Sequence, residues 1–394
     1  MEKKRIILSI LVISLIINLI LFWIYYYINR NFELKLEPQN SGSSIPKIVD
    51  KKYVEQNQEI FTKIIDLQND VIKAINKAWP SVVSIIVSKD LQVYYEDPNN
   101  FFGGYVTEEK QKIWWWSWII VSSDGYVITN KHVVEDSNSE YTVITKDGDT
   151  YKVDKIRLDP ILDIAIVKII DNNWQIPSNL QPAELNSFKS IVKIWQFAVA
   201  IWNALAEYEN SVSFGIISGK DRQLEAGEQK SVYLWLYQTD APINQWNSGG
   251  PLLDIQWNVI WINTAISAIG QGIWFAIPIN KEFISSTLEI IKSRGKIVRP
   301  FLGVEYKSLN KSIAKNLNLD KFEWIYISNV VTGTNAEKIW LKKWDIITEI
   351  NWNKINADNN FLYLLYTFKP WDKVDLTIYS NKKYKKLSMT LWER

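Results

Sequence analysis

A serine in a glycine-rich turn is the first candidate for chemistry in this chain. The segment Gln245-Trp246-Asn247-Ser248-Gly249-Gly250-Pro251 lies between two strand-like runs. A serine nucleophile needs an exposed hydroxyl on a tight turn and nearby backbone N–H groups that converge on the developing oxyanion. Glycines beside Ser248 permit such a backbone. The segment alone fits a plain glycine-rich loop equally well, so the interpretation depends on finding a base.

A serine hydroxyl also requires a base, usually histidine, and a carboxylate that orients the base. His132 is the only histidine among the 394 residues, and it follows a strand-like run. Asp163 precedes the apolar run Ile164–Ile170, where its carboxylate would lie against the imidazole. A lone histidine is more often a core or surface residue, and aspartates at strand ends are often turn formers. With an independent serine motif present, His132 becomes the only available imidazole base.

Composition excludes several other classes of chemistry. The chain has no cysteine, which excludes disulfides, thiolate metal sites and a cysteine nucleophile. The formal net charge of +2 gives no indication of a nucleic-acid partner. We expect neither a metal nor a cofactor. The 47% hydrophobic and 22% charged residues are typical of a globular protein.

Tryptophan stands where turns usually require glycine. The chain has 20 Trp and only 15 Gly. Trp352 follows Asn351 where Asn-Gly would form a type I′ hairpin, Trp371 follows Pro370 where a type II turn needs φ > 0, and Trp257 separates two strand-like runs. We hypothesise that most of these residues are glycine in the native protein, encoded by UGA and translated here as Trp. The alternative is a genuinely Trp-rich protein, and the codons decide between the two.

The N-terminal region predicts a membrane anchor. Residues 6–28 contain no charge, and 23 helical residues are long enough to cross a bilayer. Lys3, Lys4 and Arg5 precede them, which places the N-terminus in the cytoplasm and the rest of the chain outside. A cleaved signal peptide is the alternative, but no small-residue cleavage site follows the apolar run. We therefore expect a single-pass protein of the cytoplasmic membrane with extracytoplasmic domains.

The remaining chain divides into a β-rich and a mixed region. Residues 31–55 read as a polar linker, and apolar residues recur at helical spacing from Gln56 to Lys77. Short β-branched runs then continue to about residue 279, followed by a helix over 280–294 that Gly295 ends. After Pro300 strands and short helices alternate. The predicted divisions are 1–30 for the cytoplasmic tip and anchor, 31–77 for linker and helix, 78–297 and 298–394 for two domains.

Three segments in the order His–Asp–Ser resemble the HtrA (Deg) family of trypsin-like serine proteases. These are Ser117–Val134, Asp159–Ala165 and Gln238–Pro251. The resemblance implies an all-β protease domain with a trypsin-like double β-barrel, followed by an α+β PDZ domain. It implies that Ser248 is the nucleophile, His132 the general base and Asp163 the orienting carboxylate. The backbone N–H groups of Trp246 and Ser248 would form the oxyanion hole.

The same resemblance implies the substrate-binding residues. Ile243 would form a wall of the specificity pocket, and Asn263, Thr264 and Ala265 would pair with substrate backbone. No acidic residue stands where a pocket for Lys or Arg would need one, so we expect cleavage after small or medium aliphatic residues. The chain departs from the family pattern mainly by Trp where the family has Gly, at positions 118, 195, 202, 246, 257, 261, 274, 324, 340, 344 and 352.

The C-terminal domain resembles a peptide-binding PDZ domain in two segments. Arg299–Val304 resembles the carboxylate-binding loop, which assigns peptide binding to Phe301, Leu302, Gly303 and Val304, and Ala336–Ile347 resembles a later PDZ signature. The alternative is a domain that only packs on the protease. Tyr94–Lys112 resembles a regulatory loop that contacts neighbouring subunits, or else is a flexible insertion. Asp221–Gln229 resembles a loop that senses PDZ occupancy.

These patterns predict a membrane-anchored endopeptidase of protein quality control and the stress response. Its substrates would be unfolded extracytoplasmic polypeptides, and C-terminal peptides would bind the PDZ domain. The resemblance implies a homotrimer. The alternative is a catalytically inactive protease-like scaffold that acts as a PDZ-based sensor or chaperone.

Position 246 gives a direct test of the glycine hypothesis. Loss of one oxyanion donor costs on the order of 3 kcal/mol in the transition state, which corresponds to about 10²-fold in kcat. We expect the chain with Trp246 to fold poorly and show little activity, and Trp246→Gly to raise kcat by that factor in a casein-cleavage assay. Full activity of the purified Trp246 protein, or a UGG codon at this position, would contradict the hypothesis.

Overall fold

The computed structural model describes residues 51–96, 104–187, 189–204, 208–226, 231–243, 247–264, 272–309, 311–316, 319, 324–356 and 359–394. The predicted membrane span, residues 6–28, lies outside these ranges. None of the helices within them combines the length and the apolar character that crossing a bilayer requires. Two compact units make up the chain, Met1–Thr62 and Lys63–Arg394. Every strand within the described ranges lies in the second unit.

Helix α2 runs from Lys51 to Ala78, so it begins earlier than the predicted start at Gln56. No proline interrupts these residues, and the lysines and glutamines at its start favour helix. Pro80 prevents its continuation, and a single 3₁₀ turn, η1 (Trp79–Ser81), leads into the first strand.

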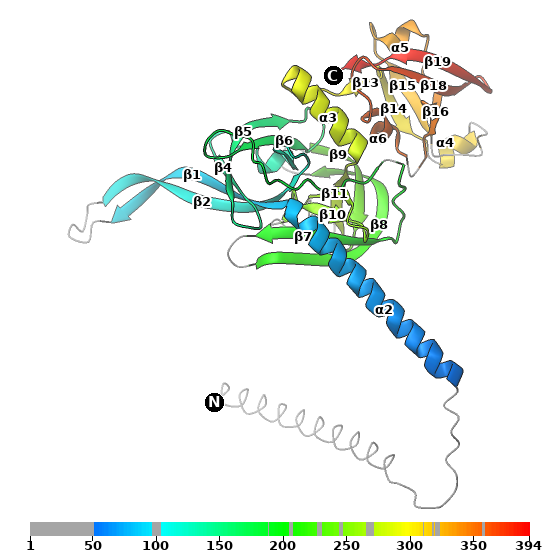
Figure 1. The fold of residues 1–394 in the computed structure, drawn as a ribbon. Helices are drawn as coiled ribbons and strands as arrows, with labels where there is room; N and C mark the ends of the chain where they lie inside the picture. Colours follow the sequence, from blue (N-terminus) through cyan, green and yellow to red (C-terminus); the bar gives the residue numbers. More distant parts are fainter. Residues whose placement is uncertain are drawn as a thin grey trace, which may run out of the picture. The chain divides into compact units, whose positions relative to one another are not determined.

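Two closed β-barrels follow, as the sequence predicts (Figure 1). The first joins its strands in the order β1-β2-β3-β6-β5-β4, and the second in the order β10-β11-β12-β9-β8-β7. Buried clusters of apolar side chains, mainly valine and isoleucine in the first barrel and alanine, isoleucine and leucine in the second, lie among these strands. Pairing of β1 with β4 and of β10 with β7 closes the two sheets. The strands of the first barrel are β1 (Val82–Glu96), β2 (Gly104–Ile120), β3 (Tyr126–Thr129), β4 (Glu140–Ile144), β5 (Thr150–Leu158) and β6 (Ala165–Ile170). Those of the second are β7 (Phe197–Ala204), β8 (Tyr208–Ala226), β9 (Ser231–Thr239), β10 (Pro251–Leu253), β11 (Val259–Thr264) and β12 (Trp274–Pro278).

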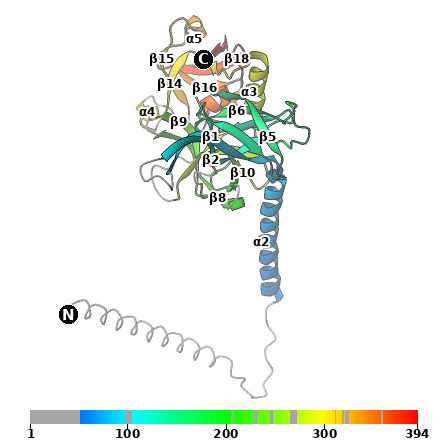
Figure 2. The same ribbon diagram turned by 90° about the vertical axis from the view of Figure 1, so that its left-hand side faces the viewer.

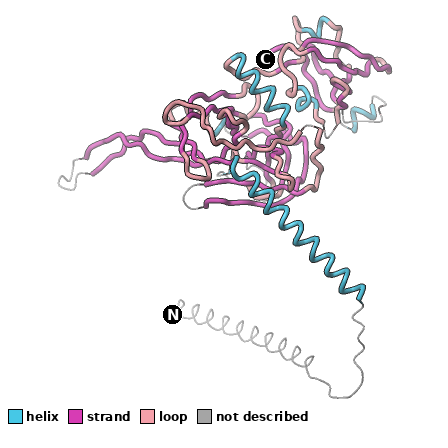
Figure 3. The backbone as a smooth tube through the Cα atoms, in the orientation of Figure 1, coloured by secondary structure: helices cyan, strands magenta, loops and turns pink. Residues whose placement is uncertain are grey.

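Strands β1 and β2 extend well past the first barrel as a long hairpin (Figure 3). Their pairing continues to Tyr95 opposite Tyr105 and Glu96 opposite Gly104. The sequence of Tyr94–Lys112 predicts a loop or insertion, whereas the structure places residues 94–96 and 104–112 in strands. Tyrosine, valine and threonine favour extended backbone, which explains the difference.

Helix α3 (Lys281–Arg294) leads from the second barrel to the C-terminal domain. It has the predicted ends: the side chain of Asn280 accepts a hydrogen bond from the N–H of Phe283, and Gly295 has φ +74°. Burial of Phe283, Ile284 and Ile291 fixes one face of the helix in the core.

The C-terminal domain is the expected small α+β unit (Figure 2). Its sheet has the order β14-β15-β16-β18-β19, with β17 paired to β16 and a separate β13-β20 pair. Tyr306 on β14 packs edge-on against Phe361 of α6, with ring centroids 4.9 Å apart. The strands are β13 (Pro300–Phe301), β14 (Val304–Ser308), β15 (Ile325–Val330), β16 (Ile346–Ile350), β17 (Asn353–Lys354), β18 (Lys373–Ser380), β19 (Lys383–Thr390) and β20 (Trp392–Glu393), and the helices are α4 (Lys311–Asn316), α5 (Asn335–Lys338) and α6 (Phe361–Leu365).

Tryptophan occupies most of the left-handed backbone positions held by residues other than glycine. Among the described residues, eight of the twelve such positions are Trp. Asn351 and Trp352 have φ of +45° and +63° between the paired residues Ile350 and Asn353, which is the predicted type I′ geometry. Trp257 and Trp371 also have positive φ, as their turns predict. By contrast, Trp118 and Trp261 are buried in strands, where φ does not demand glycine.

These conformations predict that glycine stabilises the exposed turns. A left-handed conformation costs an L-residue about 1–2 kcal/mol, and replacement by glycine removes this cost. Glycine also loses more backbone entropy on folding, which offsets about 0.5–1 kcal/mol of the stabilisation. We therefore expect Trp195→Gly, Trp340→Gly and Trp352→Gly each to raise the free energy of unfolding by up to about 1 kcal/mol. Thermal denaturation measures the effect.

The matched control is Trp392→Gly, because Trp392 lies in the extended strand β20. There glycine should lower the melting temperature. A uniform loss of stability in all four variants would show that the positive-φ positions carry no such strain.

Candidate active site

A histidine–aspartate pair lies where β3 and β6 are adjacent. His132 is in the short turn η2 (Lys131–Val133) directly after β3, and Asp163 precedes β6. The Nδ1 atom of His132 is 2.8 Å from Oδ2 of Asp163, and the backbone N–H of His132 donates to Oδ1 at 3.0 Å. The Asp163 side chain is 10% exposed and that of His132 35% exposed. The carboxylate is thus sheltered, while the imidazole keeps one side open.

Asp163 is held in place through a turn that Asp159 organises. The Oδ1 atom of Asp159 accepts hydrogen bonds from the N–H groups of Ile161 and Leu162, both at 2.9 Å. The N–H of Asp159 donates to the carbonyl of Ile164 at 2.9 Å, which closes the turn at the start of β6. Asp159 is completely buried. Such side-chain capping fixes the backbone of a short turn.

Two further polar residues contact Asp163 from opposite barrels. Asn130, which is buried two residues before His132, donates from Nδ2 to the backbone carbonyl of Asp163 at 3.2 Å. Thr264 at the end of β11 donates from Oγ1 to Oδ2 of Asp163 at 3.4 Å. Asp163 therefore receives one further contact from each barrel, at its backbone carbonyl and at its carboxylate respectively. Burial raises the pKa of nearby Tyr233 to about 12, with the negative charges of Asp163 and Glu135 as lesser causes, so its phenol stays protonated near neutral pH.

The turn that carries Ser248 packs tightly against the histidine strand. Gly249 has φ +84°, and a Cβ atom there would clash with Oγ1 of Thr129 and approach the carbonyl oxygen of Ser117 to 2.5 Å. Thr129 lies three residues before His132 at the end of β3. Only glycine therefore allows the serine turn to approach this closely. The Ser248 side chain is itself fully buried.

Strand β11 connects the serine turn to the aspartate. The N–H of Gly249 donates to the carbonyl of Asn263, and the N–H of Asn263 donates to the carbonyl of Gly250, both at 2.9 Å. The next residue, Thr264, contacts Asp163. His132 and Asp163 therefore belong to one connected set of contacts with Gly249 and Gly250, the two residues that follow Ser248 in its turn.

Of the other residues predicted for the protease site, three are buried and two lie outside the residues that the structure describes. Ile243, Asn263 and Thr264 are fully buried in the second barrel. Trp246 and Ala265 lie outside the described residues. Asn130 and Asp159 lie within the family-like segments, but their roles were not predicted, because nothing in the local sequence reveals which groups a buried Asn or Asp side chain will contact.

The predicted peptide-binding loop of the C-terminal domain has a glycine in the left-handed backbone region. Gly303 has φ +89° and its missing Cβ leaves space that Thr334 fills. Leu302 and Val304 are buried, and Phe301 is partly exposed. β14, which begins at Val304, forms one edge of its sheet. Arg299 differs from the expectation for a carboxylate-binding segment, because its guanidinium is fully buried against Asp159.

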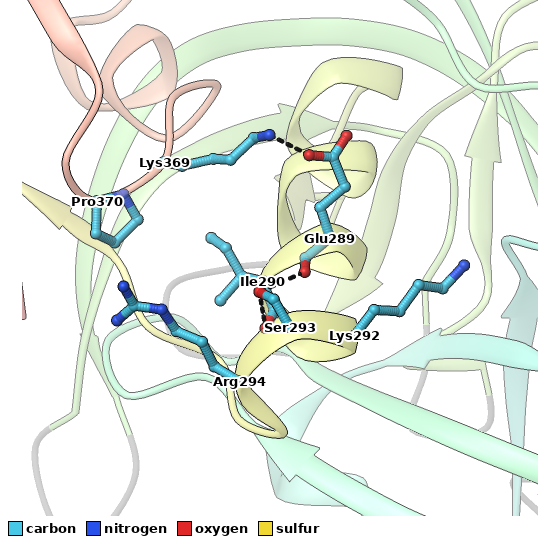
Figure 4. A pocket seen from close by; sticks show the side chains of 7 residues that line it. All are labelled: Glu289, Ile290, Lys292, Ser293, Arg294, Lys369 and Pro370. Carbon is cyan, nitrogen blue, oxygen red and sulfur yellow. Dashed lines mark hydrogen bonds and ion pairs between the residues drawn. The ribbon is translucent and has the colours of Figure 1, made fainter.

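A separate cavity of about 620 Å³ lies between α3 and the turn that precedes β18 (Figure 4). An ion pair between Glu289 and Lys369 crosses it. Its lining residues are Glu289, Ile290, Lys292, Ser293, Arg294, Lys369 and Pro370. None of these belongs to the His132–Asp163–Ser248 set, so this cavity is not the candidate active site.

Gly249 provides a test of this packing. Gly249→Ala has two costs. The alanine is strained at a positive φ, and its Cβ clashes with its neighbours, which costs about 1–3 kcal/mol in a packed site. Gly148→Ala is the matched control, because Gly148 has φ +86° and no atom within 4 Å of the added Cβ. We expect urea denaturation to show a larger loss in the free energy of unfolding for Gly249→Ala than for Gly148→Ala, and the difference should equal the cost of the clash. Equal losses would mean that the serine turn does not pack on Thr129 and Ser117.

Two family models match the chain: a trypsin-like peptidase domain over residues 117–261 and a PDZ domain over residues 300–391. A probable periplasmic serine endoprotease DegP-like of Chlamydia pneumoniae is 30% identical over 377 residues, covering 89% of this chain and 74% of that protein. One of the same description from Marinomonas sp. (strain MWYL1) is 33% identical over 281 residues, covering 71% of this chain. The chain spans 57% of the length of that relative.

Solved structures agree with these matches. The HtrA-type protease AlgW with decapeptide is 27% identical, with a TM-score of 0.55 over 82% of this chain and 98% of that chain. The same protease with tripeptide gives the same identity and TM-score. The HtrA resemblance seen in the sequence is thereby confirmed, and the chain belongs to the HtrA (DegP-like) family, whose members join a trypsin-like peptidase domain to a PDZ domain.

Proposed function

We propose that this protein is a serine endopeptidase with Ser248 as nucleophile, His132 as general base and Asp163 as orienting carboxylate. The 2.8 Å contact between His132 Nδ1 and Asp163 Oδ2 carries the proposal. Because Asp163 occupies Nδ1, the ring nitrogen left to exchange a proton with a hydroxyl is Nε2. This is the tautomer that a serine–histidine pair needs.

The reaction then follows from these positions. Oγ of Ser248 attacks the scissile carbonyl carbon while Nε2 of His132 accepts the hydroxyl proton. The C–N bond breaks as His132 returns that proton to the departing amine, which leaves an acyl-enzyme on Ser248. Water, deprotonated by the same nitrogen, releases the acid product and restores the serine. Asp163 holds the imidazole in orientation and stabilises the imidazolium.

The oxyanion hole and substrate contacts complete the proposed site. The backbone N–H groups of residues 246 and 248 would bind the oxyanion, and the positive φ of Gly249 supports a turn of the required kind. Ile243, Asn263, Thr264 and Ala265 would line the substrate site. The buried, uncharged side chain of Ile243 favours cleavage after aliphatic residues.

Peptide binding is assigned to the PDZ domain at Phe301, Leu302, Gly303 and Val304. β14 forms an edge of the sheet and starts directly after this loop, so an extended peptide can add to it as a further strand. The solved AlgW relatives are described with a decapeptide and a tripeptide. A C-terminal peptide is the occupant that such a loop and edge fit best.

Residues 6–28 are proposed to anchor the protein in the cytoplasmic membrane, with the domains 78–297 and 298–394 outside. The periplasmic relatives support an extracytoplasmic location for the domains. Misfolded extracytoplasmic proteins are then the proposed substrates, and a homotrimer, suggested by the family resemblance, is the proposed assembly.

A second candidate function is that of an inactive scaffold that binds misfolded chains. The complete burial of Ser248 favours it, because a nucleophile must meet its substrate. In the peptidase proposal the segments around the serine turn must therefore move when substrate binds. The two candidates differ in whether Ser248 ever forms an ester.

Substitution of Ser248 and Asp163 separates these candidates. We expect Ser248→Ala to reduce kcat for casein by a factor on the order of 10⁶ and Asp163→Asn by about 10⁴, because the latter leaves the nucleophile but loses the imidazole tautomer in which Nε2 can accept its proton. A fluorophosphonate probe should label the wild type and not Ser248→Ala. Suppression of aggregation by Ser248→Ala serves as the control for folding and chain binding.

The wild type for this test carries the residue that its gene specifies at position 246. If this protein neither cleaves casein nor reacts with the probe, the scaffold function is supported. If it still suppressed aggregation, the peptidase proposal would be rejected.

A further inference from the structure

One ion pair in the described part of the chain is completely buried, and it joins residues 140 positions apart. Arg299 donates from Nε to Oδ2 of Asp159 at 2.7 Å and also contacts this oxygen through Nη2. Its third nitrogen, Nη1, donates to Oγ1 of Thr287 on α3 at 2.8 Å. The guanidinium carbon lies 4.3 Å from the ring centroid of Phe283. Both charged side chains are 0% exposed.

The two oxygens of Asp159 have different partners. Oδ2 pairs with Arg299, whereas Oδ1 caps the N–H groups of Ile161 and Leu162 in the turn that ends at Asp163. A rotation of the Asp159 carboxylate would therefore disturb that turn. The orientation of the carboxylate is set by the two nitrogens of the guanidinium.

Arg299 is itself fixed at the junction between α3 and the PDZ domain. Its backbone N–H and C=O pair with those of Arg394, at 3.2 and 2.9 Å. Its guanidinium also lies 5.4 Å from the ring centroid of Tyr366, whose carbonyl accepts a hydrogen bond from Ser286 of α3. The pair thus connects the start of the PDZ domain to the turn of Asp163.

Stability gives a weak reason for such a pair. Removal of two charges from water is expensive, and well-packed apolar residues often replace a buried ion pair without loss of stability. The distinctive property of a buried arginine–carboxylate contact is its fixed geometry.

We propose that Arg299 is a positioning residue for Asp163, acting through the carboxylate of Asp159. The guanidinium orients Asp159, Asp159 builds the turn, and the turn sets Asp163 against His132. The catalytic consequence rests on the peptidase function proposed above.

The single histidine gives a readout that does not depend on activity. In full-length protein labelled with ¹⁵N-histidine, the proton on Nδ1 of His132 that is bound to Asp163 gives one downfield resonance. We expect this resonance to shift or disappear in Arg299→Gln. Arg294→Gln is the matched control, because Arg294 lies at the same junction and pairs with Glu393 instead of Asp159.

Peptidase kinetics provide the second readout. They are measured in whichever protein is active, the one with Trp or the one with Gly at position 246. A small misplacement of a catalytic group costs up to about 10²-fold, so we expect Arg299→Gln to lower kcat about 10- to 100-fold with KM nearly unchanged. Arg299→Lys, which keeps the charge without the fork, should retain part of this kcat. In an Asp163→Asn background, Arg299→Gln should have no further effect, because both act through the same carboxylate.

A folded Arg299→Gln protein that keeps the His132 resonance and kcat, and differs only in melting temperature, would overturn the proposal. If Arg299→Gln is not recovered folded, Asp159→Asn decides by the same criteria, since it keeps an oxygen for the turn and removes the charge. If the parent enzyme has no peptidase activity, the proposed function fails by itself. The resonance alone then decides whether Arg299 positions Asp163.

Discussion

The hydrogen bond between His132 and Asp163 is the interaction on which the proposed chemistry depends. The chain has one histidine, so no other imidazole could replace it as the base. The bond determines which ring nitrogen faces the nucleophile, and the burial of Asp163 keeps solvent from competing for the carboxylate. The two residues come from separate connections of one barrel, and Thr264 reaches Asp163 from the other. Closure of both barrels is therefore what assembles the site.

Left-handed backbone is the second constraint on this fold. Gly249 and Gly303 occupy positions where a Cβ would collide with a threonine, so close packing and conformation both require glycine there. Trp340 and Trp352 occupy the same backbone region on the surface, where conformation alone favours glycine. The difference explains why tryptophan is sterically possible at exposed turns.

Motifs and turn chemistry predicted the parts of the structure that local sequence determines. The pairing of His132 with Asp163, the ends of α3 at Asn280 and Gly295, and the type I′ turn at Asn351 and Trp352 were all accessible in this way. The extent of the β1–β2 hairpin was not, because its charged and aromatic residues lack a clean alternation of polar and apolar positions. The buried contact between Arg299 and Asp159 was also missed, since neither residue has a local pattern that reveals a partner 140 positions away.

The contacts at the junction between the protease and PDZ domains differ greatly in how strictly they fix geometry. Arg294 with Glu393 and Lys369 with Glu289 are solvent-exposed pairs, which salt screens and side-chain entropy weakens. Arg299 and Asp159 are shielded from both effects. A displacement of the PDZ domain could therefore rearrange the exposed pairs at little cost, whereas movement of Arg299 would carry Asp159 with it. The turn that ends at Asp163, the proposed orienting carboxylate, is thus connected to the domain junction by direct contacts through Asp159 and Arg299.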